Sequence, residues 1–490
     1  MSEDKPKDGG GANVVPLAVK RMVKASRNPS RVLSGAAPDR ESVLHDPDID
    51  DGDIIDRMND EFAFVVIGGS AAVAWFEPGA RPEDSLRLLK IGAFEGLMGH
   101  RWTTYDGADG KPKTVTWAKR WLGHPERATY RGLEFVPSPT GEEGRAGWLN
   151  LWRGFAVEPK AGGSWAIFRD HLLSNVCQGN EAHFRWLFGW FAQMVQRPRD
   201  KPGTAVILRG GQGVGKSIVG EVFGSLLGPH WKLVDTDRGV TGNFNQHLSD
   251  CLLLQADEAV WAGNKDAEGR LKGLVTAGRQ MVEAKGIDPV WLPNLVRVFM
   301  TSNSDYVAPA GKDERRYFVL DVGDSAQRNS AYFGEMLEEL DAGGREALLH
   351  DLLTFDLSAV DIRETPKTEA LREQKIHHLD PLETWLLDRL KAGAPTRKHD
   401  GWPELVPCDD LYDDYLTASE RAGFRRKLGQ TAFGRKLKAF IPGLTRQRAS
   451  VAQGDAMKRP YVYWLPSLQQ CRDEFDAALQ QPGDWDSPDD

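Results

Sequence analysis

Apolar residues in the centre of the chain recur in short runs that are separated by polar or glycine-rich segments. Three such runs, residues 206–208, 252–254 and 296–300, have the composition and length of buried strands, and "YFVLDV" is a fourth. Behind the first run, the apolar residues of "SIVGEVFG" recur at helical spacing. This alternation of strand and helix predicts an α/β core with a parallel sheet over residues 200–375.

The pattern is different before residue 200. Residues 1–50 are rich in Gly, Pro, Ser, Asp and Lys and predict a disordered arm. Residues 51–199 predict an aromatic-rich α+β module that starts with a short helix and two strands around Gly68-Gly69. This module holds nine of the sixteen tryptophans, which at mixed spacing are typical of a core, although exposed ones could stack on bases. Its role stays open between an oligomerisation collar and a DNA-entry surface.

Two further segments follow the α/β core. Residues 376–466 read as three helices followed by a β-hairpin that ends in "YVYWL", an order that predicts a winged-helix-like module. Residues 467–490 are acidic and predict a tail, either a protein-interaction segment or an arm that masks a basic surface.

A glycine-rich stretch links the first buried strand to its helix. Residues 210–217, "GGQGVGKS", fit G-x-x-x-x-G-K-[ST] without a mismatch, in the strand–loop–helix context that this loop requires. Glycines let backbone N–H groups turn toward phosphate oxygens, and the lysine reaches the terminal phosphates. We therefore expect a nucleoside triphosphate and Mg²⁺ here, with the ion held by the last residue of the set. The predicted nucleotide-binding residues are Gly210, Gly211, Gln212, Gly213, Val214, Gly215, Lys216 and Ser217.

Polar side chains end the next two strands. Asp257 and Glu258 close the second strand, and Asp257 follows Ser217 by 40 residues, a spacing that fits one helix and a crossover to the adjacent strand. We expect Asp257 to hold Mg²⁺ and Glu258 to orient or deprotonate the attacking water. Asn303 ends the third strand, where its amide could bond the γ-phosphate or that water.

Basic residues downstream suggest two more roles. Arg315 and Arg316 precede the fourth strand and suit an arginine finger supplied to a neighbouring subunit, although an ion pair with Asp313 or Glu314 is the alternative. Lys285 lies at the tip of a predicted hairpin, where six copies in a ring would line a pore and grip phosphates.

Composition limits the remaining possibilities. The apolar fraction of 40% and charged fraction of 27% are ordinary for a soluble protein. The sequence contains no run of eighteen apolar residues, the length that would predict a membrane span. Four cysteines without C-x-x-C spacing argue against disulfides and a zinc site, so we expect a reducing compartment, the cytoplasm.

The net charge of −9 hides a local basic segment. Residues 421–460 hold eleven Lys or Arg and one Asp, a local net charge of +10. "FRRKLGQTAFGRKL" is either a recognition helix for duplex DNA or a solvated basic face. The residues expected to contact DNA are Lys285, Arg425, Arg426, Lys427, Arg435 and Lys436.

Taken together, these motifs resemble the superfamily 3 helicases, the AAA+-type hexameric motors of viruses, phages and plasmids. The resemblance is closest to the helicase half of phage and plasmid primase–helicase proteins. It rests on residues 210–217, the pair Asp257-Glu258, Lys285, Asn303 and the arginine pair in "DERRYFVLD". It implies ATP hydrolysis in a hexameric ring that moves 3′ to 5′ on single-stranded DNA during replication of a phage, prophage or mobile element.

The resemblance leaves alternatives. A primase module is not evident, so we expect a separate primase or polymerase to supply primers. An AAA+ switch that acts as a loader, an initiator or an anti-phage sensor would need no DNA-gripping hairpin. A DNA-binding origin or repressor protein would bind a specific duplex through its C-terminal module alone.

Overall fold

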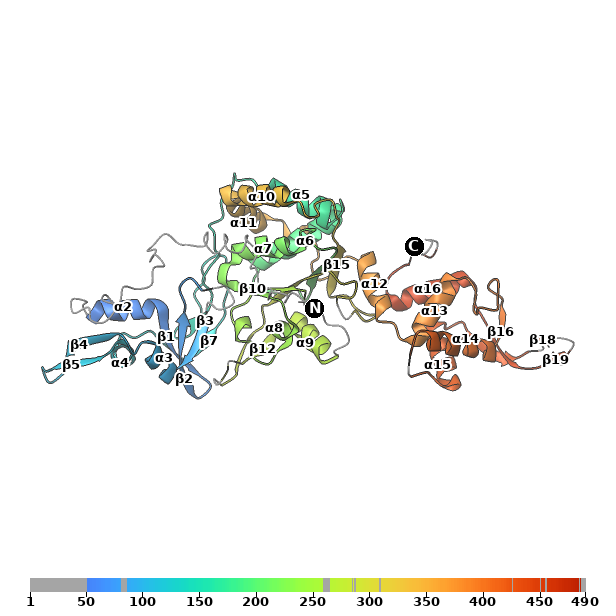
Figure 1. Ribbon diagram of the computed structural model, residues 1–490, viewed down its shortest axis with the longest axis horizontal. Helices are drawn as coiled ribbons and strands as arrows, with labels where there is room; N and C mark the ends of the chain where they lie inside the picture. The colour runs from blue at the N-terminus through green and yellow to red at the C-terminus, as the bar shows by residue number, and fades with distance from the viewer. Residues whose placement is uncertain are drawn as a thin grey trace, which may run out of the picture. The chain divides into compact units, whose positions relative to one another are not determined.

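The computed structural model describes residues 51–80, 86–258, 265–283, 285, 288–307, 310–424, 426–449, 451–453, 456–483 and 485. The predicted N-terminal arm lies outside this range. The described residues form two compact units (Figure 1). The first contains those up to residue 303 together with 321–363, and the second contains 304–320 and those from 364 onward.

Strands β9, β10, β11 and β14 form the centre of the first unit, in a five-stranded sheet with the order β10-β11-β14-β9-β15. The pairs β10–β11, β11–β14 and β14–β9 are parallel, as the sequence predicted for this α/β core. Every residue of β9 is buried, which agrees with its uninterrupted apolar run. The strands are β9 (Ala205–Arg209), β10 (Trp231–Val234), β11 (Leu253–Asp257), β14 (Arg297–Ser302) and β15 (Tyr317–Asp321).

Helices cover both faces of this sheet. In Figure 1, α6 and α7 lie on one face, and α8 and α9 lie on the other. Helix α6 buries a run of ten residues and ends before Pro198, as its apolar sequence predicted. The helices of this part of the first unit are α6 (Glu181–Gln196), α7 (Lys216–Leu227), α8 (Asp237–Thr241), α9 (Lys265–Thr276), α10 (Ser330–Glu339) and α11 (Arg345–Thr354).

The predicted position of β11 was wrong. The spacing from Ser217 to Asp257 suggested that β11 would lie next to β9, but β14 lies between them. Residues in direct register are Phe299 and Val206 on one side of β14, and Phe299 and Gln255 on the other. Spacing along the chain limits how far a crossover can reach but does not fix which slot in the sheet the strand fills.

The N-terminal module has its own core within the first unit. Its sheet has the order β3-β2-β1-β6, and β1 and β2 are the two predicted strands around Gly68-Gly69. Trp121 is fully buried and contacts Phe62 and Phe94, whereas Trp102 is 45% exposed, so most but not all tryptophans serve the core. The elements are α2 (Asp51–Glu61), β1 (Phe62–Ile67), β2 (Ser70–Phe76), β3 (Leu86–Lys90), α3 (Ile91–Leu97), β4 (Trp102–Asp106), β5 (Pro112–Thr116), α4 (Trp117–Leu122), β6 (Thr129–Tyr130), β7 (Leu133–Glu134), β8 (Leu149–Asn150) and α5 (Ala166–Asp170).

A buried histidine ties this module to the central sheet. The Arg153 backbone N–H donates to Nε2 of His230 at 2.9 Å, so the Nδ1–H donates to the Asp250 carbonyl at 2.8 Å. Trp152 stacks on the imidazole with ring centroids 4.5 Å apart. Complete burial lowers the pKa of His230 to about 3, so the ring is neutral in the folded protein.

This histidine predicts a stability that falls in mild acid. The unfolded chain binds a proton at His230 below its ordinary pKa of about 6.5, while the folded chain does not until about pH 3. The stabilisation is therefore complete above pH 6.5 and is lost as the pH falls, by about 1.4 kcal/mol per pH unit. We expect urea unfolding at pH 7 and pH 5 to show a smaller decrease for His230→Phe than for the wild type. The exposed His377→Phe is the control, and equal pH dependence in all three proteins would contradict the assignment.

The second unit contains a group of helices and two small sheets. The helices α13, α14 and α15 and the antiparallel pair β17–β20 match the predicted triplet and hairpin. The sequence missed β16, which completes the sheet order β16-β20-β17. The elements are α12 (Glu369–His377), α13 (Pro381–Lys391), β16 (Leu405–Pro407), α14 (Cys408–Arg421), α15 (Gln430–Phe440), β17 (Thr445–Arg448), β18 (Val451–Gln453), β19 (Ala456–Lys458), β20 (Tyr461–Trp464) and α16 (Leu468–Leu479).

Two predicted boundaries need correction. The tail predicted from residue 467 begins instead with α16, whose Cys471, Phe475 and Leu479 are buried in the core of the second unit. These residues recur every four positions, so they form one apolar stripe that the count of acids obscured. The boundary predicted at 375/376 was also wrong, because residues 304–320 and 364–375 belong to the second unit.

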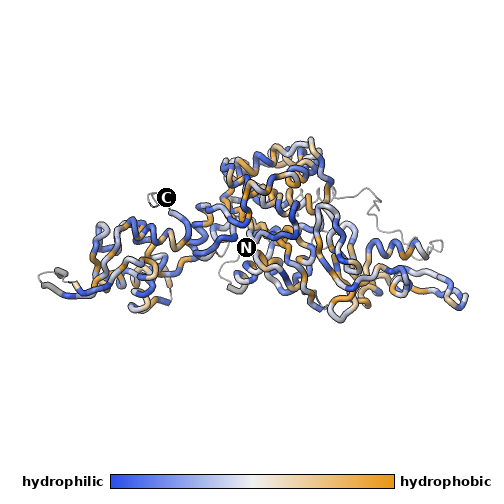
Figure 2. Tube along the Cα trace, turned by 180° about the vertical axis from the view of Figure 1, so that it is seen from behind, coloured by the Kyte–Doolittle hydropathy of each residue, from blue (hydrophilic) through white to orange (hydrophobic). Residues whose placement is uncertain are grey.

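Apolar and polar positions interleave along the trace of both units (Figure 2). In the described part of the chain, no helix is long and apolar enough to cross a membrane.

Candidate nucleotide-binding site

The loop between β9 and α7 adopts a backbone that glycine favours. Gly213 and Gly215 have φ angles of +80° and +94°, which side chains other than hydrogen rarely allow. A Cβ at Gly215 would lie 2.5 Å from the imidazole of His171, so the site also lacks room for one. The loop between β9 and α7 therefore requires glycine at both Gly213 and Gly215.

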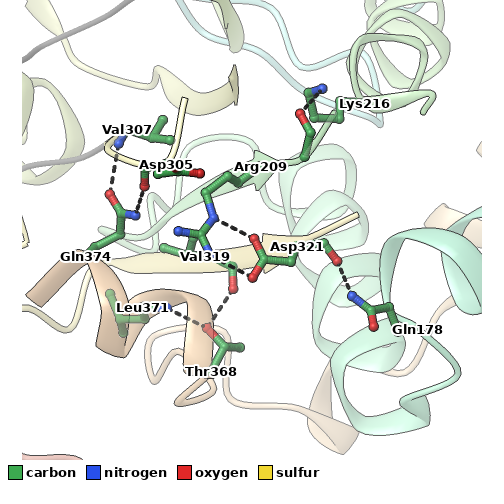
Figure 3. A network of polar contacts seen from close by, with 11 residues as sticks. Gln178, Arg209, Lys216, Asp305, Val307, Val319, Asp321, Thr368, Leu371 and Gln374 are labelled. Atoms are coloured by element: carbon green, nitrogen blue, oxygen red, sulfur yellow. Dashed lines mark hydrogen bonds and ion pairs between the residues drawn. The ribbon is translucent and has the colours of Figure 1, made fainter. Parts of the chain in front are cut away.

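Lys216 begins α7 and turns its ammonium back over the loop. Its Nζ donates to the Gly210 carbonyl at 2.8 Å, to the Gly211 carbonyl at 2.6 Å and to Oδ1 of Asn303 at 2.8 Å (Figure 3 shows Lys216). Burial lowers the pKa of Lys216, and the nearby Glu258 and Asp257 carboxylates oppose that decrease. The ammonium is thus aimed into the loop and bonded to the residue that follows the neighbouring strand β14.

Two hydroxyl groups contact the carboxylate at the end of β11. The Ser217 hydroxyl donates to Oδ2 of Asp257 at 2.9 Å, and the Thr301 hydroxyl donates to Oδ1. A hydroxyl and a carboxylate side by side are oxygen ligands of the kind that Mg²⁺ prefers. The donor set of Ser217 and Asp257 therefore fits the predicted ion.

Glu258 lies one residue further and has an unusual backbone. Its φ is +57°, rare for a residue with a Cβ, and its backbone N–H donates to the Thr301 carbonyl at 3.0 Å. The Asn303 Nδ2 donates to Glu258 Oε1, so Asn303 links Lys216 to Glu258. Strained backbone conformations of this kind concentrate at functional sites.

These groups open onto one cavity of about 440 Å³. Its lining includes the lysine, the hydroxyl, the two acids and the asparagine, together with an aromatic ring and an arginine. The lining residues are Gln212, Gly213, Gly215, Lys216, Ser217, Ile218, Asp257, Glu258, Asn303, Arg328, Ser330 and Phe333.

Sequence reasoning missed the residues that support the loop from behind. His171 and Asn175 lie in a π-helical turn (His171–Val176), where His171 Nε2 lies 3.2 Å from the Gly215 carbonyl. Asn175 Nδ2 donates to the Val214 carbonyl at 2.9 Å. The Arg328 backbone N–H donates to the Gly213 carbonyl at 2.9 Å. These residues lie 39 to 115 positions along the chain from their partners in the loop, so no local pattern could identify them.

An ion pair fixes the strand that leads into the loop. Arg209 ends β9, and its guanidinium bonds both carboxylate oxygens of Asp321 at 2.5 and 2.8 Å (Figure 3). The Gln178 amide donates to the Asp321 carbonyl at 2.5 Å. The ion pair between Arg209 and Asp321 therefore fixes the end of β9, where the loop starts.

A family model matches a region that includes this site. Residues 208–316 match a family of unknown function (DUF5906). The chain is 22% identical over 174 residues to a DNA primase-polymerase of Nitratiruptor phage NrS-1, a match that covers 35% of this chain and 24% of that protein. The chain thus spans about a quarter of the length of the curated relative it matches.

Two apo structures of the NrS-1 C-terminal region are similar over almost their whole length. Each has 15% sequence identity and a TM-score of 0.57, and each comparison covers 84% of this chain and 98% of that chain. This chain shares the fold of the NrS-1 C-terminal region. At this identity the likeness concerns the fold alone.

Arg315 and Arg316 differ in ion pairing. Arg316 bonds both carboxylate oxygens of the buried Glu314 at 3.0 and 2.9 Å, so the alternative of an ion pair with Glu314 holds for this arginine. Arg315 is exposed, and among the described residues its guanidinium forms no ion pair. Arg315 is therefore the better candidate for a group presented to a neighbouring subunit.

Lys285 lies where the sequence predicted it. The strands β12 (Arg279–Val282) and β13 (Val290–Pro293) pair antiparallel, which confirms the hairpin. Lys285 is an exposed turn residue between them.

The basic residues near α15 differ in exposure and in whether they form ion pairs. Lys436 forms ion pairs with Asp380 and Glu383, and Lys427 forms one with Glu420, so both of these predicted DNA contacts have an acid partner in the fold. Arg426 and Arg435 are exposed, but Arg426 precedes the helix, which begins at Gln430. Arg425 lies outside the described residues.

Proposed function

We propose that this protein is an ATP-dependent DNA helicase or translocase of the superfamily 3 type, acting in the replication of a phage, prophage or mobile element. The observation that carries the proposal is the convergence of Lys216, Ser217, Asp257, Glu258 and Asn303 on one cavity. Similarity to a phage DNA primase-polymerase supports a replicative setting. A phosphate-binding loop, an ion-binding pair and a base for water are the parts that ATP hydrolysis needs.

The chemistry follows from the positions of these side chains. Ser217 and Asp257 would hold Mg²⁺, which neutralises charge on the phosphate oxygens. Lys216 would donate to those oxygens instead of to the Gly210 and Gly211 carbonyls. Glu258 would take the proton of water as the water oxygen bonds to the γ-phosphorus and the bond to the bridging oxygen of ADP breaks.

Asn303 is placed to couple the lysine to the base. It accepts from Lys216 and donates to Glu258. A γ-phosphate that attracted the Lys216 ammonium would change both bonds, which would release Glu258 to bond water. A charge from Arg315 of a neighbouring subunit would complete the site in a ring, which we propose to be a hexamer.

We propose that the hairpin of β12 and β13 binds DNA. Lys285 is exposed at its turn, where an ammonium can bond a phosphate of single-stranded DNA. The same chain could cooperate with a separate primase or polymerase, and the second unit could bind duplex DNA.

The test is ATP hydrolysis with and without single-stranded DNA, for the wild type and for Lys285→Ala, with oligomer mass measured alongside. We expect DNA to raise the wild-type rate severalfold. The variant should assemble and hydrolyse ATP at the basal rate but lose most of the stimulation, because the cation that contacts phosphate is gone. Lys160→Ala, which removes an exposed lysine outside the hairpin, is the control.

The alternative outcome is informative. If DNA leaves the rate unchanged in all three proteins, the translocase proposal fails. An AAA+ switch that loads a partner, initiates replication or senses phage DNA would then be the better description.

A further inference from the structure

The second unit exposes a basic strand pair that the sequence did not single out. All four residues of β17 are exposed, including Arg446 and Arg448. On the neighbouring strand, Tyr461 is 44% exposed, and its ring contacts both guanidinium groups, with centroid distances of 4.0 Å to Arg446 and 4.9 Å to Arg448. We call Arg446, Arg448 and Tyr461 the arginine–tyrosine cluster.

The register places the cluster on one face of the sheet. Arg448 lies opposite Tyr461, and Arg446 lies opposite Tyr463 two residues further along β20. Residues two apart on a strand point to the same side, so both guanidiniums and the exposed ring face the same way. The tyrosine ring holds the two cations on that face by cation–π contacts.

Helix α15 packs beside this sheet. A Cβ at Gly434 would lie 2.4 Å from the Tyr463 hydroxyl, so the glycine permits a close approach. The exposed cations of α15 include Arg435, whereas Lys436 is paired with Asp380 and Glu383. Lys438 of α15 is also exposed, and among the described residues it forms no ion pair, so the helix and the strand pair both offer cations without acid partners.

The charge around the cluster is of one sign. The described residues between 441 and 472 include no Asp or Glu, and neither Arg446 nor Arg448 forms an ion pair within the described part of the chain. Arg459, just before β20, is also exposed. The Arg446 side chain hydrogen-bonds Cys408 but, like Arg448, has no carboxylate partner among the described residues. Guanidiniums of this kind beside an exposed aromatic ring suit nucleic acid, because guanidinium binds phosphate bidentately and the ring can stack on a base.

We propose that the arginine–tyrosine cluster on β17 and β20 is a nucleic-acid binding site that contacts the phosphate backbone through Arg446 and Arg448. The proposal rests on the proposed function only in taking DNA as the polymer that the protein acts on. Phosphates of a duplex and of a single strand offer the same chemistry, so the experiment distinguishes them.

The experiment measures binding of the full chain to a labelled 30-base-pair duplex and to a 30-nucleotide single strand by fluorescence anisotropy, over a series of salt concentrations. In Arg446→Ala/Arg448→Ala we expect affinity for the contacted form to fall about tenfold to hundredfold at low salt. The slope of log affinity against log salt should fall by about 2, because two phosphate contacts are lost. Arg57→Ala/Arg185→Ala removes the same charge from exposed positions in the first unit and should leave both quantities near the wild-type values.

Two further variants separate charge from folding. Arg446→Lys/Arg448→Lys keeps the cations and should restore most of the salt dependence. Tyr461→Phe should bind like the wild type, whereas Tyr461→Ala should bind more weakly with little change in slope. In the double alanine variant, loss of duplex binding alone would identify the duplex as the ligand. Loss of both duplex and single-strand binding would identify the phosphate backbone that the two forms share.

Unchanged affinity and slope in the double alanine variant would overturn the proposal. A change in oligomer mass without a change in DNA binding would also overturn it and would indicate an acidic protein partner or a second copy. Basal ATP hydrolysis without DNA should be the same in every cluster variant. If the wild type does not hydrolyse ATP, the proposed function fails, while the binding measurement still decides the site.

Discussion

Replacing Lys216 by alanine is expected to lower the turnover of ATP hydrolysis by about a thousandfold. The ammonium is the cation that points into the loop, bonded to the Gly210 and Gly211 carbonyls and to Asn303. Without it, charge that develops on the terminal phosphate in the transition state has no donor from α7. Phosphate release from the purified protein measures the effect directly.

Binding should weaken together with turnover. A non-hydrolysable ATP analogue at 100 times its dissociation constant stabilises a folded protein by about 2.7 kcal/mol, and the variant should lose most of that gain at the same concentration. Lys312→Ala is a matched control, because this lysine pairs with Glu383 in the second unit. Undiminished hydrolysis in Lys216→Ala would mean that the cavity is not the ATPase site.

Replacing Glu258 by glutamine is expected to separate binding from chemistry. The amide keeps the shape of the side chain and an oxygen that can accept from Asn303 Nδ2, but it cannot take a proton from water. Turnover should fall about a hundredfold to ten-thousandfold, while affinity for ATP and Mg²⁺ stays near the wild-type value. Single-turnover hydrolysis and an equilibrium titration with ATP measure the two quantities.

The control for this variant is Glu335→Gln, an exposed position on α10. Equal losses of affinity and turnover in Glu258→Gln would point to a role in holding the ion or the fold. A wild-type rate would assign the proton to another group.

The candidate site was largely predictable because its motifs are local. A tight loop needs glycines at fixed offsets, and a buried strand needs a run of apolar residues before its terminal acid. Both patterns appear within about ten residues, as in residues 210–217 and in the run that ends at Asp257. The Lys285 hairpin and the helices α6, α13 and α14 were predicted for the same reason, since the period of their apolar residues is set by the element itself.

Other features depended on which segments pack together. The insertion of β14 between β9 and β11, and the support of the loop by His171 and Asn175, join parts of the chain that lie far apart. The same holds for Lys436, whose ion pairs with α13 withdraw it from the basic surface.

The sequence by itself therefore determined the α/β class, the glycine-rich loop, the acids and asparagine at the strand ends, and the hairpin with Lys285. Only the tertiary structure decided that these groups share one cavity, that Arg316 is paired while Arg315 is exposed, and that α16 belongs to a core. The physical reason is that backbone conformation and apolar periodicity are short-range properties of a chain. Ion pairing, strand order and burial depend on neighbours that the fold brings from elsewhere.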